Sequence, residues 1–140
     1  MTAGLILLVE DNADDEKLTL RALKKHNIAN PIVVARDGQE AMDYLLDSSK
    51  QLPAVILLDL KLPKISGLEV LRQVRATART QFVPVVILTS SNEDADLIAG
   101  YKGGCNSYIR KPVDFDQFVE AARTLGLYWL VLNEAPPVSC

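Results

Sequence analysis

Short runs of apolar residues without alternation recur along the chain, and turn residues or charges bound each of them. An unbroken apolar run of this length is typical of a strand that is buried on both faces of a parallel sheet. One of these runs stands between Pro53 and Pro63 and ends in Asp59. The sequence predicts strands at residues 5–9, 31–35, 54–58, 84–88 and 107–109.

The segments between these runs are amphipathic, with apolar residues three or four positions apart, which is the spacing of one helix face. In the first such segment we expect Leu18 and Leu23 to face the core, and in the second Leu45 and Leu46. The predicted helices lie at about residues 12–27, 39–47, 92–103 and 114–125, and a further one begins at residue 66 or 67.

Strands and helices therefore alternate, as they do in a parallel sheet with helices on both faces. The fold class that fits is α/β, a flavodoxin-like (βα)5 doubly wound, five-stranded parallel sheet with strand order 2-1-3-4-5. In that order the direction of winding reverses between the first and third strands, and ligands bind at such a reversal. The first strand is followed by Glu10 and Asp11 and the third by Asp59, so we expect these acids to meet there.

Composition fits one globular domain. The chain has 140 residues, of which 49% are hydrophobic and 24% are charged, so it can bury a single core. A net charge of −3 gives no electrostatic reason to expect a nucleic acid partner. The apolar run near the start is too short to span a membrane and is followed by acids. We therefore expect a cytoplasmic protein without membrane contact.

Carboxylates gathered at one edge of a sheet repel one another, and either raised pKa values or a bound cation would relieve the repulsion. Mg²⁺ accepts a few carboxylates and keeps its other positions for water and phosphate oxygens. With such an ion in place, Asp59 would stay ionised and act as the nucleophile of aspartyl-phosphate chemistry. We therefore predict that Asp59 is a phosphorylation site that depends on Mg²⁺.

Two polar residues at the ends of the fourth and fifth predicted strands could assist the phosphorylation of Asp59. Thr89 could donate a hydrogen bond to a phosphoryl oxygen, and Lys111 could reach the same group as a point charge. Plainer roles stay open at this point. Glu10 and Asp11 could be partners of a helix dipole, Thr89 could be a helix cap, and Lys111 could be a solvated surface charge.

Four motifs, in order at the strand ends, resemble the receiver domain of two-component response regulators. They cover residues 9–12, 57–63 with Gly67 four positions beyond, 88–90 and 108–112. We expect a receiver domain at residues 4–126, followed by an apolar extension and tail at 127–140. The resemblance implies a phosphoacceptor that promotes its own phosphorylation and dephosphorylation, rather than a conventional enzyme. It also implies a sensor histidine kinase as the phosphoryl donor.

The resemblance assigns the cofactor and its ligands. The cofactor would be Mg²⁺, bound by Asp11, by Asp59 and by the backbone carbonyl of Lys61. Glu10 would bind the ion through water.

The same resemblance assigns the phosphoryl contacts and a switch. Thr89 and Lys111 would contact the phosphoryl group, and Tyr108 would be the aromatic residue that moves inward with Thr89. The peptide bond between Lys111 and Pro112 would be cis, which proline permits at low cost. Tyr108 could instead be ordinary strand packing.

The tail carries a second resemblance. Residues 127–132 are apolar without interruption, which exceeds what one buried helix face needs. Together with the opening at residues 12–15, this tail resembles the stand-alone response regulators of phytochrome-type histidine kinases. We expect a homodimer through the fourth helix, the fifth strand, the last helix and the extension. The contact residues would be Leu127, Tyr128, Trp129 and Leu130. The alternative is that the tail folds back over its own core.

The sequence gives weaker support to three other functions and to two variants of the receiver function. A haloacid-dehalogenase-type phosphatase would need a second aspartate where Lys61 stands. An FMN carrier would need a phosphate loop where the acids at residues 10–15 stand. A degenerate receiver could act as a constitutive binding module, and a complete receiver could serve a non-phytochrome histidine kinase or act as a phosphorelay intermediate.

Overall fold

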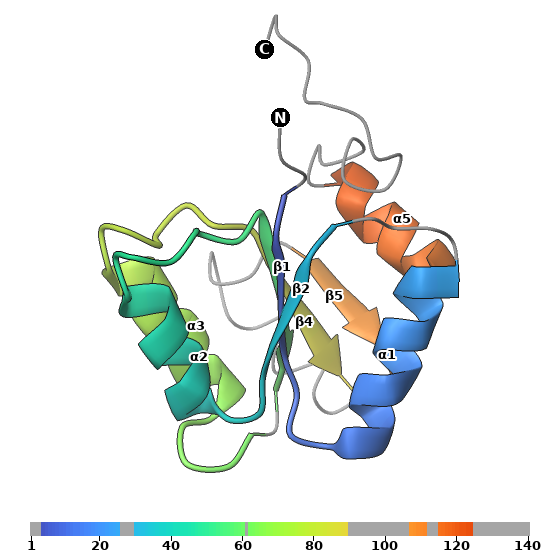
Figure 1. Cartoon of the computed structure of the whole chain (residues 1–140), viewed down its shortest axis with the longest axis horizontal. Coiled ribbons are helices and arrows are strands. Elements are labelled where there is room, and N and C mark those ends of the chain that lie inside the picture. Colours follow the sequence, from blue (N-terminus) through green and yellow to red (C-terminus); the bar gives the residue numbers. More distant parts are fainter. Residues whose placement is uncertain (1–3, 26–29, 61, 90–106, 112–114, 125–140) are drawn as a thin grey trace, which may run out of the picture.

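The computed structural model describes residues 4–25, 30–60, 62–89, 107–111 and 115–124, and Figure 1 shows its elements. The strands are β1 (Ile6–Val9), β2 (Ile32–Ala35), β3 (Val55–Asp59), β4 (Val85–Thr89) and β5 (Ser107–Arg110). The helices are α1 (Ala13–Lys25), α2 (Gly38–Leu46), α3 (Gly67–Ala76) and α5 (Phe115–Thr124). The strand predictions are confirmed almost to the residue, and the helix predicted at 92–103 lies outside the described residues.

The strands form one parallel sheet in the order β2-β1-β3-β4-β5, which confirms the predicted doubly wound fold. Val9 pairs with Leu58 in the register of β1 and β3, and Asp59 pairs with Leu88 in the register of β3 and β4. The residues that follow Val9 therefore lie beside the end of β3. This edge is the lower one in Figure 1.

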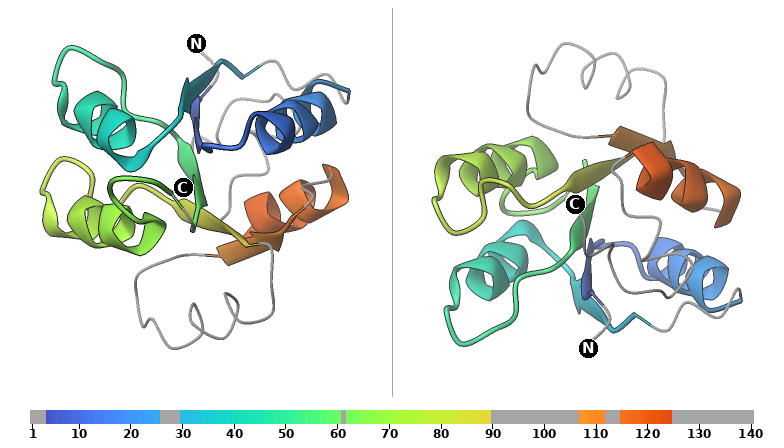
Figure 2. Two further views of the ribbon diagram at one scale, coloured as in Figure 1. Left: turned by 90° about the horizontal axis from the view of Figure 1, so that it is seen from below. Right: turned by 90° about the horizontal axis from the view of Figure 1, so that it is seen from above.

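The sheet has a core on each face, because successive side chains of a strand point to opposite faces. Figures 1 and 2 show α2 and α3 on one side of the sheet and α1 and α5 on the other. Leu7 and Val9 pack into the core under α2 and α3, whereas Ile6 and Leu8 pack into the core under α1 and α5. All four side chains are fully buried, which explains why the run has no polar alternation. No helix in the described part of the chain has the length and apolar character needed to cross a bilayer.

Two of the expected core positions are wrong. Leu18 of α1 is 43% exposed and Leu46 of α2 is 52% exposed. In α1 the sheet-facing positions are Thr19 and Leu23, four residues apart, so Leu18 points roughly 100° away around the helix. Leu46 is likewise the neighbour of a core residue rather than a core residue. The buried residues of α2 are Gly38, Ala41, Met42 and Leu45.

The start of α3 packs closely against the end of β3. Ser66 caps the helix, its hydroxyl accepting a hydrogen bond from the backbone N–H three residues on at 3.2 Å. Gly67 follows, and its backbone N–H donates to the Leu60 carbonyl at 3.0 Å. A Cβ added at Gly67 would lie 2.3 Å from the Asp59 carbonyl oxygen. The glycine is therefore needed for the helix to approach the backbone that carries Asp59.

Candidate functional site

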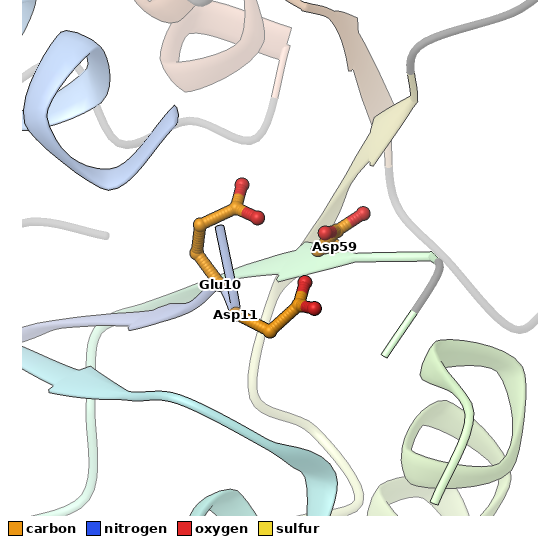
Figure 3. Close-up of side chains that lie close together, drawn as sticks. All are labelled: Glu10, Asp11 and Asp59. Carbon is orange, nitrogen blue, oxygen red and sulfur yellow. The ribbon is translucent and has the colours of Figure 1, made fainter. Parts of the chain in front are cut away.

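Glu10, Asp11 and Asp59 meet at the carboxyl edge of the sheet, as Figure 3 shows. Each offers a carboxylate oxygen, and these oxygens all lie within 4.8 Å of one another. Glu10 is fully buried and Asp59 is 6% exposed, whereas Asp11 faces solvent. The structure therefore brings together the three acids that the strand order had predicted to meet.

Lys111 reaches into this cluster from the residue after β5. Its Nζ atom lies 2.8 Å from Glu10 Oε1 and 3.1 Å from Asp59 Oδ2, and the lysine side chain is only 11% exposed. The reading of Lys111 as a solvated surface charge is therefore excluded. One cation and three carboxylates leave the group with excess negative charge.

Burial and crowding shift the ionisation of the cluster. Burial, together with the hydrogen bond and negative charge of the Asp59 carboxyl, raises the pKa of Glu10 to about 7, although Lys111 opposes the rise. Burial alone would lower the pKa of Lys111. The close contacts with the Glu10 and Asp59 carboxylates and their negative charges outweigh it, so the pKa of Lys111 is raised overall. The lysine therefore stays charged, whereas the negative form of Glu10 is destabilised by burial and by the neighbouring carboxylate.

The start of α1 adds Asp15 to the site, a residue to which the sequence had assigned no role there. Asn12 Oδ1 caps the helix by accepting from the backbone N–H of Asp15 at 2.9 Å, and Asn12 N donates to Glu10 Oε2 at 3.3 Å. This turn places Asp15 Oδ2 3.1 Å from Lys111 Nζ. No local pattern in the sequence indicates this contact of Asp15, because it joins residues 96 positions apart.

Residues 6–123 match the family model of the response regulator receiver domain. The chain belongs to this family. Receiver domains are phosphoacceptors without a conventional catalytic role, and they bind Mg²⁺ or Mn²⁺ at an acidic pocket. In this receiver the pocket contains the acids Glu10, Asp11 and Asp59.

Several relatives of this receiver resemble it over most of its length. The probable methanogenesis regulatory protein FilR2 of Methanothrix harundinacea is 40% identical over 135 residues, 94% of this chain and 87% of that protein. The structure of the bacteriophytochrome response regulator AtBRR is 50% identical, has a TM-score of 0.86, and matches over 92% of this chain and 96% of that one. The Mn²⁺-bound structure of Rcp1, a response regulator of Synechocystis, is 33% identical with a TM-score of 0.73 over 96% of this receiver and 99% of that chain. The resemblance to phytochrome-type regulators is thereby confirmed.

The acidic pocket of this receiver fits a divalent cation. Oxygen ligands of one magnesium ion stand roughly 3 to 4 Å apart, and the three acids offer oxygens close to this spacing. In addition, the buried Glu10 Oε1 accepts no well-formed hydrogen bond from the described residues. Lys111 neutralises the charge of Glu10 only in part, because the lysine is shared with Asp59 and Asp15. Oxygen donors of this kind suit a hard cation such as Mg²⁺ or Mn²⁺.

An ion pair links the two loops beside the pocket. Asp37 caps α2, and its carboxylate lies 3.2 Å from Lys64 Nζ in the loop between β3 and α3. Lys64 has a φ of 65°, a left-handed conformation that is uncommon for lysine. The hydrogen bond to Glu40 N and the neighbouring Lys64 lower the pKa of Asp37. The pair thus joins the loop between β3 and α3 to the start of α2.

The remaining predicted site residues lie wholly or partly outside the described residues. Thr89 ends β4, paired in register with Arg110, and Tyr108 lies within β5, but the side chains of Thr89 and Tyr108 are outside the described part. The Lys61 carbonyl, the Lys111–Pro112 peptide bond and the contact residues 127–130 lie outside it as well. Their roles stay predictions.

Proposed function

We propose that this receiver accepts a phosphoryl group on Asp59 from a sensor histidine kinase, with Mg²⁺ as cofactor. The convergence of three acids on one point, with Lys111 3.1 Å from Asp59, carries the proposal. Asp11, Asp59 and the Lys61 carbonyl would hold Mg²⁺ directly, and Glu10 would hold it through water. The bound ion supplies neutralisation of the negative charge that builds up on the transferred group.

The residues of the chain position the reacting atoms. Asp59, as a carboxylate, attacks the phosphorus atom; an oxygen–phosphorus bond forms, and the bond from phosphorus to the donor breaks. The electron pair of the broken bond returns to the donor, which is the kinase imidazole or the carboxylate of acetyl phosphate. The Lys111 ammonium donates to a phosphoryl oxygen, and Thr89 donates a further hydrogen bond. Positioning and charge neutralisation provide most of the catalysis in such a transfer.

Removing the metal is expected to abolish the reaction. With acetyl phosphate and excess Mg²⁺ the protein should gain phosphate, and with EDTA the rate should fall by at least about tenfold because the carboxylates then repel the anionic donor. Phosphate gain can be followed by intact mass. A rate that is unchanged in EDTA would refute the assigned role of the metal. No gain with the metal present would instead favour the degenerate receiver.

A phytochrome-type photoreceptor kinase is the partner that we propose. AtBRR, at 50% identity, is described as a bacteriophytochrome response regulator, which supports this choice. The alternative is a kinase of another type, or a place as a phosphorelay intermediate. Phosphotransfer from purified, autophosphorylated kinases decides between them: the phytochrome-type kinase should transfer its phosphate to this receiver much faster than the others.

The output that we propose is a changed association with another protein. Phosphorylation would bias an existing equilibrium between inactive and active conformations, with Thr89 and Tyr108 responding to the charge at Asp59. We also propose a homodimer through the fourth helix, β5, α5 and the apolar extension.

Truncation tests the dimer contact. A chain that ends at Gly126 lacks Leu127, Tyr128, Trp129 and Leu130, and it is expected to sediment as a monomer where the full chain sediments as a dimer. An identical oligomeric state for the two chains, with and without phosphorylation, would show that the extension is not the dimer contact.

A further inference from the structure

The Lys111 ammonium is held by three carboxylates. Its Nζ atom lies 2.8 Å from Glu10, 3.1 Å from Asp59 and 3.1 Å from Asp15. A lysine ammonium has three N–H donors and no acceptor. The contact with Asp15 is a hydrogen bond, and the contacts with Glu10 and Asp59 are ion pairs. The ammonium is therefore already engaged by three carboxylates in the unphosphorylated chain.

A phosphoryl oxygen on Asp59 has to compete with these partners for the Lys111 ammonium. The side chain of Glu10 is 0% exposed, so releasing it would leave a buried charge without its counter-ion. The Asp59 carboxylate becomes part of the acyl phosphate, and the charge on the phosphoryl oxygens still needs the lysine. The side chain of Asp15 is 34% exposed, so water can replace the lysine. Asp15 also lies in the first turn of α1, where the helix dipole favours a free carboxylate. Asp15 is thus the partner whose release requires the least free energy.

We infer that Asp15 is a positioning residue that holds Lys111 in the unphosphorylated receiver and competes with the phosphoryl group for it. Asp15 thereby slows the phosphorylation of Asp59. This inference rests on the proposed function, since it concerns the same lysine and the same acceptor. It adds a regulatory residue from α1 to a site otherwise built from the ends of β1, β3, β4 and β5.

The Asp15→Asn variant removes the competing charge and leaves at most a neutral amide acceptor beside Lys111, which holds the ammonium less strongly. Phosphorylation by acetyl phosphate in saturating Mg²⁺ should become about three- to tenfold faster at low ionic strength, the factor expected for one unit charge near the reacting group. The gain should shrink as salt is added. The Asp15→Glu variant restores a carboxylate within reach of Lys111 and should return the rate to that of the wild type.

Asp14 provides the matched control. It lies in the same exposed first turn of α1, and no contact with Lys111 is found among the described residues. The Asp14→Asn variant changes net charge and helix dipole as Asp15→Asn does, but it leaves the lysine held. Its rate should stay within about twofold of the wild type. A difference between the two variants therefore measures the contact rather than the net charge.

The outcomes separate the two claims. If the wild type gains no phosphate, the proposed function fails. If the wild type gains phosphate and Asp15→Asn matches Asp14→Asn, only the inference about Asp15 fails. If Asp15→Asn is slower than the wild type, Asp15 assists the reaction and the inference is overturned. Should Asp15→Asn fail to fold, Asp15→Ser, which keeps a polar side chain in the first turn, is judged by the same criteria.

Discussion

Without divalent metal, the Glu10→Gln variant is expected to be more stable than the wild type by about 2 to 3 kcal/mol at about pH 8. Burial, together with the Asp59 carboxyl, raises the pKa of Glu10 from 4.5 to about 7. The folded chain then loses stability as Glu10 ionises. Glutamine has nearly the same shape, and its amide oxygen can stay beside Lys111. The amide nitrogen then replaces the oxygen that accepts from Asn12 N at 3.3 Å, so the variant loses that long hydrogen bond, and the expected gain allows for this loss.

The sign of the effect fixes its pH dependence. A carboxyl whose pKa is higher in the folded state carries no penalty at pH values below its pKa in the unfolded chain. The penalty grows as the pH rises toward the folded value and is complete above it. The advantage of Glu10→Gln should therefore shrink to less than about 1 kcal/mol near pH 5. Added Mg²⁺ should stabilise the wild type more than the variant.

Urea unfolding at both pH values, with EDTA and with Mg²⁺, measures this difference. Glu69→Gln is the control, because Glu69 lies on the surface and its hydrogen bonds to Arg72 and Gln73 lower its pKa. That substitution should reduce stability slightly at the higher pH. If Glu10→Gln unfolded more easily than the wild type in EDTA at the higher pH, the claim that ionised Glu10 destabilises the folded chain would be wrong.

The Gly67→Ala variant is expected to lower the free energy of unfolding by about 3 kcal/mol, the upper part of the range for overpacking. The new Cβ would lie 2.3 Å from the Asp59 carbonyl oxygen and 2.7 Å from Leu60 Cα. Both atoms belong to the backbone, so no side chain can turn aside to make room. Either α3 or the end of β3 must move, and the second movement displaces Asp59. We therefore also expect phosphorylation to slow by about tenfold.

Ser66→Ala is the matched control at the same helix start. It removes the capping hydroxyl, which accepts from Glu69 N at 3.2 Å, and should reduce stability by about 1 kcal/mol. It inserts no atom between α3 and β3, so the rate of phosphorylation should stay unchanged. Urea unfolding and the acetyl phosphate reaction measure both variants. A Gly67→Ala protein as stable as the Ser66→Ala protein would contradict the close packing.

The strands could be predicted from the sequence because the sheet is parallel and covered on both faces. Every residue of β1 and of β3 is buried, so the strands appear as continuous apolar runs whose ends are marked by Glu10, Asp59 and the prolines. The alternation of strands and helices predicted a parallel sheet, and the number of units fitted the flavodoxin-like strand order. It placed the acids at one edge without any knowledge of distances.

Helix faces were harder to predict. The pattern of apolar residues shows which side chains are apolar, but burial depends on which side chains point toward the sheet. Thr19 is 2% exposed and its neighbour Leu18 is 43% exposed, although leucine is the more apolar residue. The face is set by the angle at which α1 meets the sheet. No local pattern in the sequence records that angle.

The candidate site was predictable where the ends of neighbouring strands supply the residues, as with Asp11, Asp59 and Lys111. Asp15 could not be assigned, because its role depends on where the first turn of α1 lies relative to a lysine 96 positions away. The left-handed conformation of Lys64, with a φ of 65°, also has no sequence signal, since glycine or asparagine would be expected at such a position.

The most direct test of the central claim is to map the phosphorylated residue. After reaction with acetyl phosphate and Mg²⁺, the peptide that contains Asp59 should be heavier by about 80 Da, the mass of one phosphoryl unit, and the Asp59→Asn protein should gain nothing. Phosphate on a different residue, or an equal gain by the Asp59→Asn protein, would contradict the account.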